Sequence, residues 1–202
     1  MPSDTTHLIA LAAALGWASG LRLWAVLLLT GAAGALGWVT LPPGLTVLEN
    51  PIVMAATGTM AAIEFLADKI PFVDSVWDAA QTLVRIPGGA ALAAAVFGGD
   101  DASGVAVAAV LGAALAANSH FAKSSLRAAV NTSPEPFSNI ALSLAGDAAV
   151  PAALWLATAH PAVLLGFVAI AALVMVAITL LLIRFLRTLF ERLRHWFSAS
   201  TA

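Results

Sequence analysis

One stretch near the end of the chain, residues 161–183, has no charged residue at any of its 23 positions. About 20 apolar residues are enough for a helix to cross the hydrocarbon core of a bilayer, which is about 30 Å thick. The rest of the chain agrees, because 61% of its 202 residues are apolar and only 10% are charged. Soluble domains carry about 25% charged residues. The sequence therefore predicts an integral membrane protein.

Other apolar stretches precede this one, at residues 8–39, 51–67, 104–121 and 137–159. The first contains 32 residues, and as one helix it would be about 48 Å long, well beyond the hydrocarbon core. Arg22 lies near its middle. We prefer a break at Arg22, with the N-terminus on the outer side. The alternative is one tilted helix with a buried arginine and an inner N-terminus.

Residues 71–97 combine two patterns. In 71–86, Asp74, Asp78, Gln81 and Arg85 recur at helical spacing, as in an amphipathic helix. We interpret it as a helix in the cytoplasmic interface, with the two aspartates on its solvated face. Residues 87–97 are too short to span alone. They either continue the preceding helix through a kink at Pro87 or form a re-entrant half-helix.

The predicted fold is an all-α polytopic transmembrane helix bundle of about 6–7 membrane segments, some of them broken or re-entrant. It forms a single domain over residues 1–202. Four arginines follow the last span, and by the positive-inside rule residues 184–202 are a basic cytoplasmic C-terminal extension. We expect a multi-pass protein of the bacterial inner membrane. These arginines are Arg184, Arg187, Arg192 and Arg194.

Charges inside the predicted spans are the main functional candidates, because a charge at the centre of a membrane helix costs about 2.5–3.5 kcal/mol. Asp147 lies farthest from the ends of its span. Glu64 and Asp68 are four residues apart on one helix face, so they could share a proton or bind a hard cation. Alternatively, Asp68 and the neighbouring Lys69 mark a helix end. The predicted substrate- or ion-binding residues are Glu64, Asp68, Asp147, Arg22 and Arg127.

Ion pairing of Asp147 with Arg22 or Arg127 is the structural alternative to a binding role for Asp147.

A second set of polar residues comprises candidates for a cavity or a functional loop. In the segment NTSPEPFSN, residues 131–139, non-helical backbone could line a polar cavity. The alternative is a helix start with Ser133 and Pro134 as N-cap and first residue. The set is Lys123, Asn131, Glu135, Asn139, Asp74 and Asp78.

Three phrases carry a family resemblance: ASGLRLW at 18–24, IEFLADKIPFVDSVWDAAQTLVRIPGG at 63–89, and AKSSLRAAVNTSPEPFSN at 122–139. They resemble a bacterial membrane family named domain of unknown function 4126. The resemblance implies a small polytopic protein of bacterial type and no particular activity. In addition, the tetrapeptide ending at Arg22 echoes the one ending at Arg127, which is compatible with an inverted repeat.

Several functional classes are excluded or disfavoured. The absence of cysteine excludes disulfides and thiolate metal sites, and the four histidines lie in separate segments. No nucleotide-binding or protease motif is present, so we expect neither an enzyme, nor a metal, nor a cofactor. The net charge of −2 gives no reason to expect nucleic acid as a partner.

We expect a transporter or channel for an ion or small solute that uses the intramembrane carboxylates and arginines. One alternative binds or translocates an anionic lipid or lipid carrier through Arg22, Arg127 and Lys123. The other is a non-transporting membrane scaffold in which all charges are structural pairs. Gly16 and Gly20 form a GxxxG spacing that predicts close helix packing. The bilayer is the expected partner, and a homo-oligomer remains open.

Overall fold

The computed structural model describes residues 4–70, 72–98, 102–132 and 137–199, and in these the chain is all-α. Five helices are long and apolar enough to cross a membrane, and a sixth span results if the 3-10 helix η1 and α2, which meet at 73°, are counted together. The polytopic bundle is confirmed, with five or six candidate spans where about six or seven were expected. The elements are α1 (Thr5–Ala35), η1 (Pro43–Glu49), α2 (Pro51–Ala67), α3 (Val73–Phe97), α4 (Ala102–Val130), α5 (Phe137–Ala159) and α6 (Pro161–Ala199).

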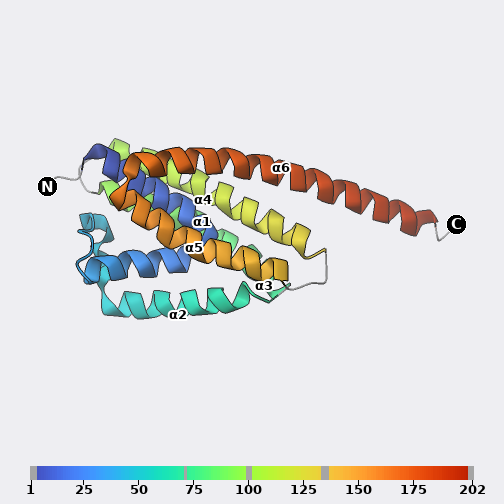
Figure 1. Ribbon diagram of the computed structural model, residues 1–202, viewed down its shortest axis with the longest axis horizontal. Helices are drawn as coiled ribbons and strands as arrows, with labels where there is room; N and C mark the ends of the chain where they lie inside the picture. Colours follow the sequence, from blue (N-terminus) through green and yellow to red (C-terminus); the bar gives the residue numbers. More distant parts are fainter. Residues whose placement is uncertain (1–3, 71, 99–101, 133–136, 200–202) are drawn as a thin grey trace.

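Helix α1 is broken at Arg22, whose φ of −153° and ψ of 84° are not helical. The first half follows α4, since Gly16 lies against the backbone of Gly112. The second half follows α3, where Trp24 donates a hydrogen bond to Gln81. Helices α3 and α4 run in opposite directions, and both ends of α1 lie at the same end of the bundle (Figure 1). The predicted break is therefore confirmed.

Close glycine contacts allow α1, α3 and α4 to cross near the centre of the bundle. A Cβ on Gly16 would lie 2.8 Å from the Cα of Gly112, and one on Gly89 would lie 2.6 Å from the Cβ of Ala116. A Cβ on Gly20 would clash with the backbone of Ala116. Small residues let helix backbones approach closely in membranes. The packing predicted from the GxxxG spacing is confirmed.

Helix α3 is continuous from Val73 to Phe97 and contains Pro87, so residues 87–97 extend the preceding helix and are not a separate half-helix. The interpretation of 71–86 as a surface-lying helix is wrong. Its polar face is buried, with Asp74, Asp78 and Arg85 at most 1% exposed. This face packs against α4 and α1, and its partners of opposite charge come from α4 and from Glu64 of α2.

Helix α1 is the most buried of the candidate spans and α6 the least. Helices α5 and α6 meet at a short connection around His160 and then diverge, with α4 visible between them (Figure 1). Helix α6 continues past the other helices. The predicted inverted repeat gains no support from local geometry, because α4 has no break at Arg127 to match the one at Arg22.

Candidate functional site

Among the described residues, ten charged side chains form one connected network of ion pairs between α1, α3, α4, α5 and the end of α2. Five are cations and five are carboxylates, so the fully ionised network has no net charge. It includes every Lys and Arg that precedes residue 184. Because each charge has at least one partner of opposite charge, pairing offsets the cost of burying it. The members are Arg22, Lys69, Arg85, Lys123 and Arg127, with Glu64, Asp68, Asp74, Asp78 and Asp147.

Asp68 lies at the centre of this network. Its carboxylate is 2.8 Å from Lys123 Nζ, 2.9 Å from Arg127 Nη1 and 3.1 Å from Arg22 Nη2. The side chain is fully buried and follows the last residue of α2. Burial alone would raise the pKa of Asp68, but the three cations outweigh it and lower the pKa to about 2. Asp68 is therefore held as a carboxylate.

Arg85 of α3 joins two carboxylates of the network. Its guanidinium is 2.6 Å from Glu64 Oε1 and 2.6 Å from Asp78 Oδ1. Lys123 Nζ connects this part to Asp68, because it is 3.3 Å from the same oxygen of Asp78. Glu64, Asp78 and Arg85 are at most 1% exposed, so removing one of them would leave an uncompensated charge in the interior.

His120 extends the Arg85 branch through hydrogen bonds of its imidazole ring. Arg85 Nη1 lies 3.2 Å from His120 Nδ1, and His120 Nε2 lies 2.7 Å from the hydroxyl of Thr82. A guanidinium can only donate, so Nδ1 accepts from Arg85 and Nε2 donates to Thr82. The Thr82 hydroxyl then donates to the Asp78 carbonyl at 3.0 Å. This series of hydrogen bonds assigns His120 a neutral ring with the proton on Nε2.

Asp147 forms the outer part of the network. It is 2.8 Å from Arg22 Nε and 3.3 Å from Lys69 Nζ, and its side chain is 23% exposed. Ser143, one turn earlier in α5, accepts a hydrogen bond from Arg22 Nη2 at 2.8 Å. Despite its central position in the α5 sequence, Asp147 is thus less buried than Glu64 or Asp68.

Lys123 of the network also stabilises the break in α1. Where the first half of α1 ends, the carbonyl of Leu21 accepts a hydrogen bond from Lys123 Nζ at 3.0 Å. An unpaired backbone carbonyl is costly in a membrane interior. Lys123 therefore satisfies the broken backbone and also links Asp68 to Asp78.

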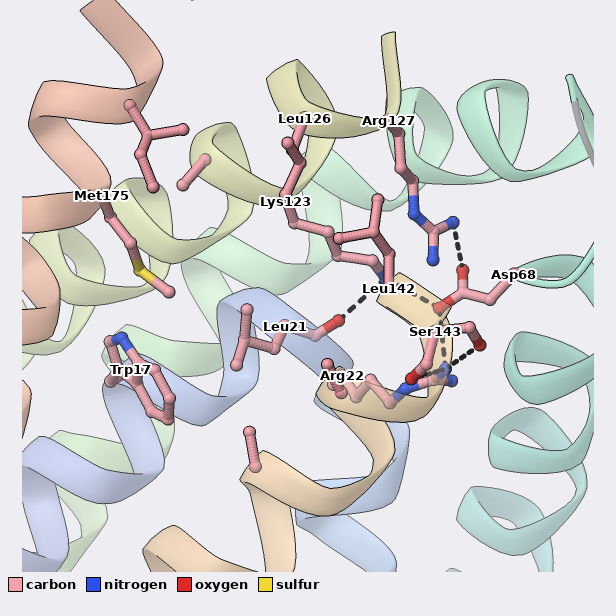
Figure 2. Close-up of a pocket in the computed structure, with 15 residues that line it drawn as sticks. Trp17, Leu21, Arg22, Asp68, Lys123, Leu126, Arg127, Leu142, Ser143 and Met175 are labelled. Carbon is pink, nitrogen blue, oxygen red and sulfur yellow. Dashed lines mark hydrogen bonds and ion pairs between the residues drawn. The ribbon is translucent and has the colours of Figure 1, made fainter. Parts of the chain in front are cut away.

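A cavity of about 210 Å³ lies beside the network, between α1, α4, α5 and α6, and it is partly open (Figure 2). Its charged lining consists of Arg22, Lys123 and Arg127 with Asp68 as the one carboxylate among the described residues. Most of its other walls are apolar, including Trp17, Leu21, Leu126, Leu142, Met175 and Ile178.

Two buried donors of cavity-lining residues, Trp17 Nε1 and Arg127 Nη2, have no hydrogen-bond or ion-pair partner in the described part of the chain. Arg127 is 1% exposed, and its Nη2 makes no hydrogen bond. Figure 2 shows the other terminal nitrogen of Arg127 bonded to Asp68. Buried donors are nearly always satisfied in native structures. Arg127 Nη2 is therefore a buried donor that no described group of the protein uses.

A second cavity, of about 250 Å³, lies on the other face of α4 at the same level. Asp78, Thr82, His120 and Ser124 contribute to its lining. No cluster of three or more His, Asp or Glu suited to a metal ion occurs in the described ranges.

Most of the predicted site residues come together in or next to the network. Arg22, Glu64, Asp68, Asp147 and Arg127 belong to it, as does Lys123. Asn131 donates to Asp74, and Asn139 donates to Asn131 at 2.6 Å. Glu135, together with the proposed cap at Ser133 and Pro134, lies outside the described residues. A binding role for the set remains a prediction.

One interpretation needs correction. Asp74 and Asp78 are not a solvated face, because both are buried and face Arg127. Asp68 does follow the end of α2, and three cations also surround it. Glu64 and Asp68 have different nearest cations, Arg85 for one and Lys123 for the other, and a proton or cation shared between them stays a prediction.

The sequence-based candidates omitted Arg85, His120, Lys69 and Ser143. Spacing contained a signal for two of them. Arg85 follows Asp78 by seven residues, which places both on one helix face. His120, Lys123 and Arg127 follow each other at intervals of three and four on α4. Lys69 and Ser143 reach the network through the tertiary fold, and no local pattern indicated them.

The family described as domain of unknown function (DUF4126) matches residues 9–183. The chain belongs to this family. The DUF4126 match includes all ten network charges and both cavities, and it ends just before the basic extension. No curated protein and no solved structure matches the chain. The chemistry of a DUF4126 site must therefore be inferred from its own geometry.

Proposed function

We propose that this multi-pass membrane protein binds an anionic amphiphile, a lipid with a phosphate headgroup, in the cavity beside Arg22, Lys123 and Arg127. The carrying observation is the charge of the cavity lining, where three cations face one carboxylate. The network as a whole is balanced, because these cations also pair with Asp74, Asp78 and Asp147, none of which lines the cavity. The free Nη2 of Arg127 supplies donors in the planar arrangement that suits phosphate.

The position and walls of the cavity favour an amphiphile over a small hydrated anion. Both α5 and α6 contribute to the cavity wall, α6 through Met175 and Ile178, and these two helices diverge after their short connection (Figure 1). In a bilayer, the outer faces of these helices contact acyl chains. An apolar tail can thus remain beside α5 and α6 while the headgroup reaches the arginines. Pockets of this composition suit ligands with one charged end.

A purely structural role explains less of the geometry. A scaffold needs each buried charge to be paired, and the ten-residue network meets that need. It does not require a partly open cavity or an unpaired guanidinium nitrogen at its wall. We place the protein in a bacterial inner membrane with the network towards the cytoplasm, since every Lys and Arg belongs either to the network or to the C-terminal extension of α6. The role we propose is binding or translocation without catalysis.

Lipid binding can be tested by native mass spectrometry of the purified protein in dodecylmaltoside. We expect dioleoyl phosphatidic acid to bind at least tenfold more tightly than dioleoyl phosphatidylcholine. Arg127→Gln should remove this preference. Arg184→Gln, which alters an exposed arginine of α6, should retain it. Equal binding of the two lipids by the parent protein would refute the proposal.

Transport of an ion or small solute is a second candidate, because α1 leaves the helical conformation at Arg22 inside the bundle. Broken helices often form the substrate sites of transporters. Glu64 and Asp147 line neither of the two cavities, so the expected carboxylate-lined cavity is not what supports this candidate. Proton or ion flux in liposomes tests it, comparing Glu64→Gln and Asp147→Asn with the parent. Unchanged flux in both variants would eliminate the carboxylate mechanism.

A further inference from the structure

We propose that Asp68 is a built-in competitor, a carboxylate that occupies the cation site until the anionic headgroup displaces it. The inference rests on the proposed function and adds how that site is regulated. Arg22, Lys123 and Arg127 all line the cavity and all contact Asp68. Any phosphate that approaches these cations therefore competes with the same carboxylate for the same donors.

The geometry at Asp68 fits replacement by another anion. Its two oxygens take one donor from each of three side chains on two different helices. A phosphate group offers more acceptor oxygens and more charge than a carboxylate. It could use these donors and also the unpaired Nη2 of Arg127, which Asp68 leaves free. Displacement would break the three ion pairs of Asp68, and the phosphate would form new ion pairs with the same three cations.

Asp68 is also placed where its release would change the structure. It caps the C-terminal end of α2, a helix whose buried residues are limited to Thr57, Glu64 and Ala67. The principal contacts of α2 are with α1, η1 and α3. The ion pairs of Asp68 with Lys123 and Arg127 therefore connect the end of α2 to α4.

The residue just before α3, four positions after Asp68, has an unusual backbone conformation. Phe72 has a φ of +68°, a conformation that bulky side chains rarely adopt. It is 70% exposed, and it lies at the start of α3. Non-glycine residues in this conformation are often found at switch regions, where the surrounding structure maintains them. Because Asp68 lies four residues before Phe72, loss of its ion pairs would free the backbone close to this unusual conformation.

Binding of dioleoyl phosphatidic acid to variants tests the competition. Asp68→Asn removes the competing charge and should tighten binding about fivefold or more, which corresponds to the loss of at least one opposing ion pair. Glu49→Gln is the charge-matched control, because Glu49 lies in η1 at the opposite end of the bundle (Figure 1). Its affinity should stay within about twofold of the parent.

The outcomes separate this inference from the proposed function. If the parent binds phosphatidic acid and Asp68→Asn binds it equally or more weakly, Asp68 is a structural residue and the competition is wrong. If neither protein binds, the proposed function fails and the competition fails with it. If Asp68→Asn binds where the parent does not, the competition is supported directly.

A measurement on the parent protein covers the case in which Asp68→Asn does not fold. The amides of Asp68, Lys69 and Ile70 bond to carbonyls of α2, so their hydrogen exchange reports whether this end opens. Phosphatidic acid should speed their exchange about fivefold if one contact of roughly 1 kcal/mol is lost. Phosphatidylcholine should leave the rate unchanged. Slower exchange with phosphatidic acid would show that the lipid tightens this end, contrary to displacement.

Discussion

Removal of Arg85 should be among the most destabilising single changes in this protein. Arg85→Met replaces a fully buried cation with an apolar side chain and leaves Glu64 without a partner within ion-pair distance among the described residues. Asp78 keeps Lys123 at 3.3 Å and Arg127 at 3.6 Å. Breaking one side of a buried pair costs about 3–5 kcal/mol because the other charge stays buried and unpaired. We expect a loss of that size.

The pairing can be separated from packing with a second change. In Arg85→Met/Glu64→Gln the orphaned carboxylate is gone, so the double variant should recover about 1–3 kcal/mol relative to the sum of the two single losses. The assay is reversible unfolding in mixed dodecylmaltoside and dodecyl sulfate micelles, with Arg184→Gln as an exposed control that changes stability by at most about 0.5 kcal/mol. Additive losses, or an Arg85→Met loss below about 1 kcal/mol, would refute the pairing argument.

Three other predictions use the same unfolding assay. Gly20→Val should lower the free energy of unfolding by about 1–3 kcal/mol, because a Cβ there meets Ala116 and Ser119. Gly166→Ala is the control and should be neutral or slightly stabilising, because a Cβ there meets nothing within 4 Å. Equal effects of the two changes would contradict the close helix crossing. Asp147→Asn should cost less than Asp68→Asn, because Asp147 is partly exposed and has two cationic partners rather than three; the reverse order would place the centre of the network elsewhere. The pKa of Asp68 is lowered from 3.8 to about 2, so its stabilising effect is complete above pH 3.8 and is lost as the pH falls through about 2. The stability difference between the parent and Asp68→Asn should therefore stay constant from pH 7 to about pH 4 and shrink below it, and a difference that shrinks already near pH 6 would contradict this.

The helices were largely predictable because apolar length is a local property. The bounds of α2 and α5 coincide with the apolar stretches 51–67 and 137–159. The break at Arg22 followed from a stretch too long for one span. The surface assignment of 71–86 failed for a tertiary reason. An amphipathic pattern shows that a helix has a polar face, but a charged face of another helix can cover it as well as water can.

Part of the site was also predictable, because a charge within an apolar stretch is visible in the local sequence. Glu64, Arg22 and Arg127 could be singled out as charges in apolar surroundings. Sequence alone could not show which charges meet, because Asp68 and Arg127 are 59 residues apart. Lys123 illustrates the limit most clearly. Its position on α4 indicates only a basic residue near a helix end, whereas in the fold it bonds Asp68, Asp78 and the Leu21 carbonyl.

The most direct test of the account is to fill the cavity without altering any charge. Ala149 lines the cavity, whereas its neighbour Ala148 is exposed on the outside of α5. We predict that Ala149→Phe abolishes the preference for phosphatidic acid over phosphatidylcholine in native mass spectrometry, and that Ala148→Phe retains it. Retention of the preference in Ala149→Phe, with the protein folded, would show that the lipid does not bind in this cavity.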